Sequence, residues 1–181
     1  MQKLMFSFLI VMFFSLKVEA QCEVSKQIGS HSNSWLAAFE EVYINEDLEN
    51  GVNKYLMSLG LNKDFNSSIP DNLTLECRYI TSSSFNYEGV QPNKISINFI
   101  DGTNLILQSL TVQTIPTDVR GFVVKSYLYE ITPNIKIQLG RSGIKEIIFW
   151  DKKENRKTVA PAKEFLKNQI VCLDVFSRTN K

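Results

Sequence analysis

The alternation of apolar and polar residues after position 72 is the feature that most limits the fold of this chain. Ile95, Ile97 and Phe99 alternate with polar neighbours, which is the period of a strand with one buried face. Asp101-Gly102 follows at once, and this dipeptide is typical of a two-residue turn between antiparallel strands. The sequence therefore predicts an antiparallel sheet. Its expected strands are residues 73–80, 95–99, 104–112, 121–131 and 144–150.

Before position 72 the apolar residues fall at helical spacing instead. Ser34 is suited to cap a helix that begins at Trp35, and Asn45 is suited to cap a second helix with acidic residues in its first turn. Gly60 stands where the second helix would end. The sequence thus predicts a pair of N-terminal helices. Their apolar faces would comprise Trp35, Phe39 and Val42 in the first helix, and Leu48, Val52, Tyr55, Leu56 and Leu59 in the second.

Two further segments carry helix signals. Leu166, Ile170 and Leu173 repeat at helical spacing after Pro161, which predicts a C-terminal helix. Residues 133–139 fit both periods, since their apolar residues alternate as in a strand. Thr132 as a cap, Pro133 at the first helical position and Gly140 near the end favour a short helix there.

These elements predict an α+β fold. We expect an antiparallel β-meander of four to six strands, packed by an N-terminal helical pair and a C-terminal helix. A chain of this length has enough apolar side chains to bury one core. Residues 21–181 are therefore expected to form a single globular domain.

Residues 1–20 have the composition of a secretory signal peptide. Lys3 precedes an apolar run from Leu4 to Leu16, and Ala20 provides a small residue for cleavage before Gln21. The run is too short to span a bilayer comfortably, and no second hydrophobic segment follows it. The sequence therefore predicts a soluble protein that is secreted or periplasmic and has no transmembrane segment.

An exported chain meets an oxidising compartment, which favours disulfide formation. The three cysteines are Cys22, Cys77 and Cys172. Cys77 and Cys172 both lie in apolar surroundings, so the predicted bridge joins these two. Two alternatives stay open: Cys22 could pair with either of them, or both could be free small residues of the core.

The charge of the chain is nearly balanced, with a formal net value of +1 at pH 7, which gives no support for nucleic acid as a partner. Acidic residues outnumber basic ones up to Pro133, and basic residues predominate afterwards. The densest basic stretch contains Lys152, Lys153, Arg156 and Lys157. The simpler interpretation of these residues is a solvated surface; as a candidate binding site they would take an anionic glycan, a lipid headgroup, an acidic protein or another anionic ligand.

The sequence contains no catalytic constellation. His31 lies in a polar lead-in that would hold a catalytic base poorly, and the cysteines lack the short spacing of a structural zinc site. No cofactor motif is present, so the sequence indicates no catalytic residue, no metal site and no cofactor. The clustered carboxylates are best explained as a solvated helix face; they are Glu40, Glu41, Glu46, Asp47 and Glu49.

The function expected from these observations is that of an exported, non-catalytic binding or interaction domain. One alternative is a carrier for an apolar ligand, because Tyr127, Tyr129, Phe149 and Trp150 lie on strands that could line a groove. The less favoured alternative is a hydrolase that uses scattered carboxylates.

Overall fold

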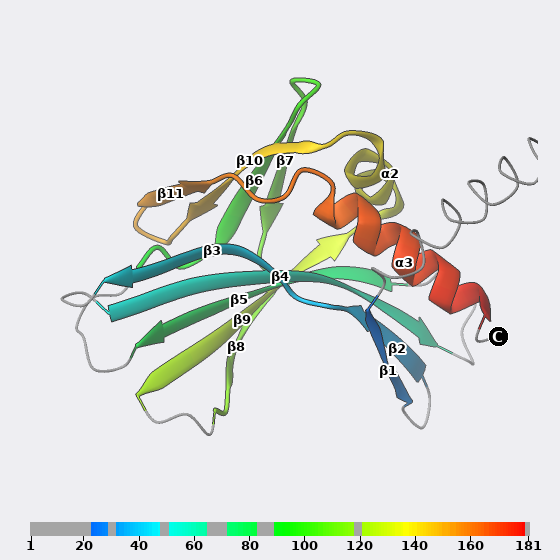
Figure 1. Ribbon diagram of the computed structural model, residues 1–181, viewed down its shortest axis with the longest axis horizontal. Helices are drawn as coiled ribbons and strands as arrows, with labels where there is room; N and C mark the ends of the chain where they lie inside the picture. The colour runs from blue at the N-terminus through cyan, green and yellow to red at the C-terminus, as the bar shows by residue number, and fades with distance from the viewer. Residues whose placement is uncertain are drawn as a thin grey trace, which may run out of the picture.

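The computed structural model describes residues 23–28, 32–47, 51–64, 72–82, 89–117 and 121–179. These residues form two antiparallel β-sheets and two helices, arranged as a β-sandwich in which the helices complete the second layer (Figure 1). None of the helices described is long and apolar enough to cross a bilayer.

The larger sheet has seven strands in the order β1-β2-β4-β5-β9-β8, with β3 paired to β4. β4 is fourteen residues long, and β5 pairs with it continuously along one edge. The opposite edge of β4 is shared, because β3 pairs with its first half and β2 with its last residues. The strands of this sheet are β1 (Val24–Ile28), β2 (Ser32–Ala37), β3 (Glu40–Asp47), β4 (Gly51–Asp64), β5 (Asn72–Ser82), β8 (Thr111–Ile115) and β9 (Phe122–Ile131).

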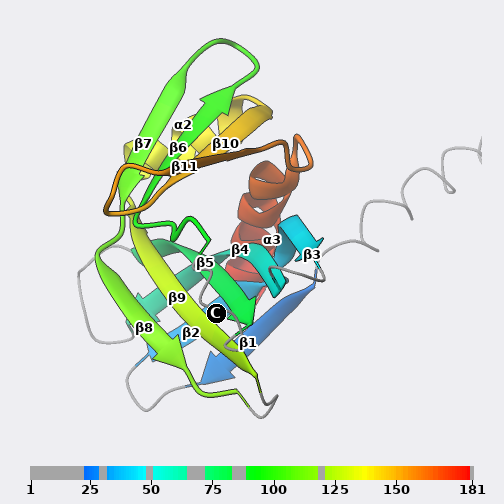
Figure 2. The same ribbon diagram turned by 90° about the vertical axis from the view of Figure 1, so that its left-hand side faces the viewer.

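The smaller sheet has four strands in the order β11-β10-β6-β7. It covers one end of the larger sheet, and the two helices cover the other end (Figure 1). Figure 2 shows the two layers from the side, with β7 of the smaller sheet leading directly into β8 of the larger. The remaining elements are β6 (Lys94–Phe99), β7 (Asn104–Gln108), β10 (Ile144–Trp150), β11 (Arg156–Val159), α2 (Pro133–Arg141) and α3 (Phe165–Thr179).

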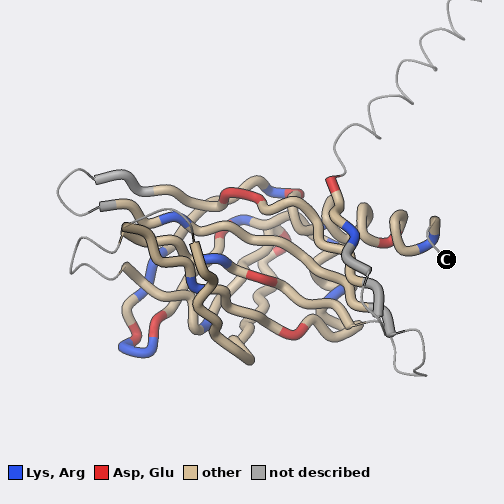
Figure 3. Tube along the Cα trace, turned by 90° about the horizontal axis from the view of Figure 1, so that it is seen from below, with Lys and Arg blue, Asp and Glu red and all other residues tan. Residues whose placement is uncertain are grey.

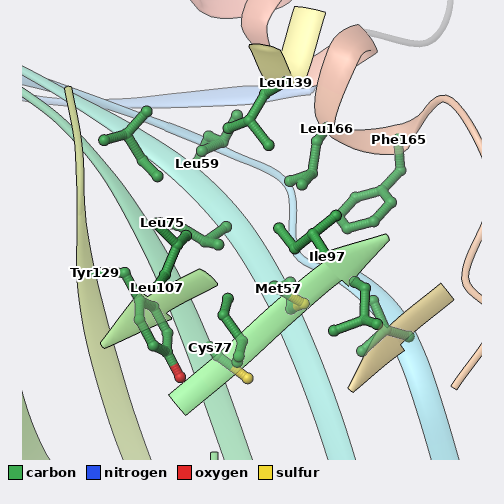
Figure 4. Close-up of a cluster of buried hydrophobic side chains, with 14 of the residues drawn as sticks. Met57, Leu59, Leu75, Cys77, Ile97, Leu107, Tyr129, Leu139, Phe165 and Leu166 are labelled. Atoms are coloured by element: carbon green, nitrogen blue, oxygen red, sulfur yellow. The ribbon is translucent and has the colours of Figure 1, made fainter. Parts of the chain in front are cut away.

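The core lies between these two layers. Residues of β5 that face it alternate strictly with half-buried ones, as one covered face of a sheet requires. Figure 4 shows Met57, Leu75 and Cys77 of the larger sheet meeting Ile97 of the smaller sheet and Leu166 of α3. One contiguous apolar cluster therefore joins both sheets and both helices.

The predicted N-terminal helical pair is wrong, and with it the predicted α+β meander. Residues 32–47 and 51–64 are strands β2, β3 and β4. The decisive pattern in β4 is the period of two that places Tyr55, Met57, Leu59 and Leu61 on the core face. Leu56 lies on the other face of the strand. Counted together with the core-face residues, it made their spacing in the sequence resemble that of a helix. Aromatic and β-branched residues in β2 and β3 also favour strands over helices.

Other local predictions are confirmed. The strand at residues 144–150 has the expected bounds, and the C-terminal helix begins at Phe165. Residues 133–139 belong to helix α2, whose cap Thr132 accepts a hydrogen bond from the amide of Ile135. The expected strand 104–112 instead divides into β7 and β8, which lie in different sheets.

The hairpin at Asp101-Gly102 is also present, but its turn is longer than predicted. The amide of Phe99 donates to the carbonyl of Thr103, which leaves Ile100, Asp101 and Gly102 in the loop. Gly102 has a φ of 84°, the left-handed conformation that a three-residue hairpin loop needs at this position. The Asp101 carboxylate accepts from the backbone amide and hydroxyl of Thr103, which favours this longer loop.

The point where β4 changes partner is closed by side chains. Between β2 and β3, residues 37–39 do not pair with β4, so the amide of Leu59 and the carbonyls of Ala37 and Ala38 bond to side chains instead. The Gln169 side chain on α3 accepts from the Leu59 amide at 2.9 Å and donates to the Ala38 carbonyl at 3.0 Å. The Ser58 hydroxyl donates to the Ala37 carbonyl at 2.5 Å. Gln169 therefore joins α3 to the sheet at this break.

We predict that Gln169→Leu lowers the free energy of unfolding by about 1 to 3 kcal/mol, because it leaves the buried amide of Leu59 without a partner and removes the bond to the Ala38 carbonyl. Urea unfolding of the purified protein measures this. Asn168→Ala, at the exposed neighbouring position on α3, serves as the control and is expected to stay within about 0.5 kcal/mol of wild type. A Gln169→Leu variant as stable as the control would contradict the prediction.

Candidate functional site

The predicted basic cluster lies on the hairpin that joins β10 to β11. Trp150 pairs with Arg156 at the base of the hairpin, so residues 151–155 form its loop. We refer to residues 150–157 as the basic hairpin. It lies at the end of the molecule away from α3 (Figure 1).

The loop of the basic hairpin is ordered by the carboxylate of Asp151. One carboxylate oxygen accepts from the backbone amides of Lys153 at 2.8 Å and Asn155 at 2.9 Å. The other oxygen accepts from the Asn155 side chain at 2.9 Å. Glu154 takes a φ of 63°, a left-handed conformation that closes the loop. The loop therefore presents its lysines from a defined backbone.

The four predicted cations do not lie in equivalent places. Lys152, Lys153 and Arg156 are exposed, whereas Lys157 is half-buried. Lys157 follows Arg156 on β11, so the two side chains point to opposite faces of the strand. The Lys157 ammonium lies 4.2 Å from the ring centre of Tyr43 on β3. Cation–π contact of this kind holds the side chain against the rim of the sandwich. Three of the four cations are thus exposed on the same hairpin, and the fourth lies against Tyr43.

A stack of aromatic rings supports the base of the basic hairpin. Tyr43 packs against Tyr55 with ring centres 5.9 Å apart, and Tyr55 stacks on Phe149 of β10 at 4.5 Å and 7°. The Tyr55 hydroxyl donates to the Val90 carbonyl at 2.6 Å. These contacts join β4 of the larger sheet to β10 of the smaller one. The base of the hairpin is therefore packed against the aromatic part of the core.

Lys94 adds a further cation that the sequence did not connect with this site. Its ammonium lies 4.6 Å from the ring centre of Trp150 and 3.7 Å from the Glu154 carboxylate. Lys94 and Trp150 are cross-strand partners on β6 and β10, so only the strand register reveals that they meet. Figure 3 shows the positions of Lys and Arg interspersed with those of Asp and Glu along the described chain.

The other predicted aromatic and acidic candidates have structural places. Tyr127, Tyr129 and Phe149 are fully buried in the core, and Trp150 is half-buried under Lys94. Glu41 forms an ion pair with Lys54 on the neighbouring strand. Glu40, Glu46 and Asp47 belong to β3 and not to the helix face expected for them, while Glu49, His31 and Cys22 lie outside the described residues.

The predicted bridge between Cys77 and Cys172 is wrong, because Cys77 is a free thiol. Its side chain is completely buried on β5, between cross-strand neighbours Met57 and Tyr127. Burial, with a smaller effect of the Glu76 charge, raises the pKa of Cys77 far above its usual range. An apolar sequence context located both cysteines in the interior but did not show that they meet.

The sequence did not predict one polar cluster, which is formed by Glu76, Arg78 and Ser126. On β5, the Arg78 guanidinium donates to the Glu76 carboxylate at 2.8 Å, and the Ser126 hydroxyl donates to the same oxygen at 2.8 Å. Arg78 also lies 4.0 Å from the ring centre of Phe39. Glu76 and Arg78 are two positions apart on one strand face, which was the only signal available in the sequence. Among the residues that the structure describes, no group of three or more side chains is arranged to hold a metal ion.

Comparisons with protein-family models, with curated proteins and with solved structures find no match to this chain.

The Asp151 loop should depend on pH. Partial burial alone would raise the pKa of Asp151, but the hydrogen bonds from Asn155 and Lys153 and the charge of Lys153 outweigh it and lower that pKa below 3.8. Because the folded-state pKa is lowered, the stabilisation of the loop is complete at neutral pH and is lost as the pH falls through the lowered value.

We therefore predict that Asp151→Ala accelerates hydrogen exchange at the amides of Lys153 and Asn155 by several-fold at neutral pH, because both amides lose their acceptor. Asp151→Asn retains an oxygen acceptor and should exchange at an intermediate rate. Exchange monitored by NMR tests this. Equal rates in wild type and Asp151→Ala would show that the carboxylate does not order the loop.

Proposed function

We propose that this chain is an exported, non-catalytic binding protein whose basic hairpin binds an anionic polysaccharide. The observation that carries the proposal is the exposure of Lys152, Lys153 and Arg156 on one ordered loop. Neighbouring cations on a fixed backbone attract a polyanion over about a Debye length and lose less conformational freedom when they bind it.

The chemistry of the hairpin favours a polysaccharide over a lipid surface. Insertion of a loop into a bilayer interface usually depends on exposed apolar side chains beside the cations. Most of the large apolar side chains that are exposed in the described chain lie on other elements, for example Ile106 on β7 and Val112 on β8; Ile44, beside Tyr43, is the exception. Sulfate and carboxylate groups of a glycan need only charge and hydrogen-bond donors, which Lys and Arg supply.

The alternative functions lack a specific supporting observation. A carrier of an apolar ligand would need the interior aromatic residues to line a cavity, whereas Tyr55 and Phe149 stack directly on each other. A hydrolase would need converging carboxylates, whereas Glu41 and Glu76 of the described chain each pair with a cation. Binding of an anionic ligand is therefore the function that we propose.

The test uses heparin as a sulfated polysaccharide probe. We expect the purified protein to bind immobilised heparin at low ionic strength and to elute with increasing salt. A variant with Lys152, Lys153, Arg156 and Lys157 all changed to Gln should bind on the order of 100-fold more weakly, given about 1 kcal/mol for each exposed cation near an anionic surface.

A matched control separates a local site from overall charge. Arg141, Lys145, Lys163 and Lys167 are exposed cations near the start of β10 and α3, so changing all four to Gln gives the same charge change at a distance from the hairpin. This control should retain binding. Equal losses in both variants would refute a site at the hairpin, and unchanged binding in both would refute a role for these cations. Stronger retention on anionic phospholipid vesicles than on heparin would assign the hairpin to lipid instead.

Export is tested separately. We expect the exported protein to begin at Gln21, because the predicted signal peptide ends at Ala20. Intact-mass measurement of protein recovered from the medium or periplasm decides this. A mass that retains residues 1–20 would contradict the predicted cleavage.

A further inference from the structure

The outer face of the smaller sheet begins at the basic hairpin. Successive side chains of its strands alternate between the core and the outer face, and Ile95, Leu107 and Phe149 are buried on the core side. The residues next to them in the sequence therefore meet on the outer face. In the row nearest the basic hairpin these are Arg156, Trp150, Lys94 and Gln108, one from each strand in the order β11-β10-β6-β7.

This row, which we call the outer row, is accessible to solvent. Arg156 and Gln108 are exposed, and Trp150 and Lys94 are half-buried. The smaller sheet forms one outer side of the molecule (Figure 2). Neighbouring strands lie about 4.8 Å apart, so the outer row extends about 14 Å across the four strands. A chain-like ligand bound at the basic hairpin can therefore continue across the sheet.

The outer row combines the groups that suit a charged sugar. The Lys94 ammonium lies 4.6 Å from the ring centre of Trp150, so a ligand that reaches this ring also meets a cation. The accessible part of the indole offers an apolar surface to the C–H groups of a sugar ring. Arg156 and Lys94 can donate charge-assisted hydrogen bonds to sulfate or carboxylate groups. The Gln108 amide nitrogen donates to the Asn93 carbonyl at 3.1 Å, which leaves the amide oxygen as an acceptor for a hydroxyl.

The carboxylates near the outer row do not block an anion. On the four strands of the smaller sheet the acidic residue is Glu146, four positions before Trp150 and thus about 13 Å away along β10. Its carboxylate accepts from the Asn98 side chain at 2.7 Å. Glu154 lies 3.7 Å from the Lys94 ammonium, but its side chain is 73% exposed, and exposed pairs of this kind are weak. Lys94 can therefore exchange Glu154 for an anionic group of a ligand.

We propose that the anionic polysaccharide bound by the basic hairpin continues across the outer row. The loop lysines attract the chain, and Trp150 and Lys94 fix it on the sheet surface. This inference rests on the proposed function and extends its site from one hairpin to four strands. It predicts a sugar contact at Trp150, which attraction by the loop lysines alone would not require.

Tryptophan fluorescence tests this contact. The two tryptophans of the chain are Trp150 and Trp35, and Trp35 is only 1% exposed. We expect a size-fractionated heparin oligosaccharide, added at low ionic strength, to shift the emission to shorter wavelength, because it displaces water from the Trp150 indole. The shift should be absent in Trp150→Phe. Heparin binding with unchanged emission, or a shift that persists in Trp150→Phe, would overturn the inference.

Affinity for the same oligosaccharide provides a second measurement. Lys94→Gln should weaken binding about five-fold, the factor expected for one cation near an anionic surface. Lys167→Gln is the matched control, because Lys167 also pairs with a glutamate, Glu164 at 3.1 Å, but lies on α3. This control should bind like wild type.

The outcomes separate this inference from the proposed function. Equal affinities of wild type and Lys94→Gln would restrict the site to the basic hairpin, which overturns the inference and leaves the proposed function in place. Equal losses in Lys94→Gln and Lys167→Gln would reveal an effect of overall charge and would also overturn the inference. Absence of heparin binding by the wild-type protein would refute both.

Discussion

The change of partner along one edge of β4 is the constraint on which the rest of the fold depends. β4 lies inside the larger sheet and is paired along both edges, and neither β2 nor β3 is long enough to cover one of these edges alone. At their junction, residues 38–39, neither strand pairs with β4, and the buried amide of Leu59 needs another acceptor. Gln169 supplies both a donor and an acceptor there, so α3 is joined to the sheet at this break.

The second layer of the sandwich consists of the two helices at one end and the smaller sheet at the other. The helices cover the end of the larger sheet where the break lies, and the smaller sheet covers the other end (Figure 1). Strands of the larger sheet are long enough to extend under both. The stacked rings of Tyr55 and Phe149 then join the two sheets at the end away from α3. The basic hairpin is supported by a contact that exists only because β10 lies over β4.

The sequence predicted the elements whose signals are local. The strand at residues 144–150, the Asp101-Gly102 hairpin and the cap of α2 each depend on neighbouring residues. β4 was misassigned because Leu56, on the less covered face, adds to the apolar residues of the core face and imitates a helical repeat. Its pairing with β5 over ten positions decides the matter, and such pairing is absent from any local window. The same distinction applies to the candidate site. The loop position of Lys152 and Lys153 could be predicted from neighbouring residues, whereas the contact of Lys157 with Tyr43 depends on residues far apart in the sequence.

The local arrangement of charge matters more than its total in this chain. The basic hairpin contains two carboxylates, Asp151 and Glu154, and neither is paired with its exposed cations Lys152, Lys153 and Arg156. The Asp151 carboxylate is turned inward to the loop backbone, where it accepts from amides, and Glu154 lies within reach of Lys94. Lys152, Lys153 and Arg156 are therefore left as the charges that face solvent. Because interactions between exposed charges are screened within about 10 Å at moderate salt, this arrangement gives a short-range attraction that a nearly neutral protein would otherwise lack.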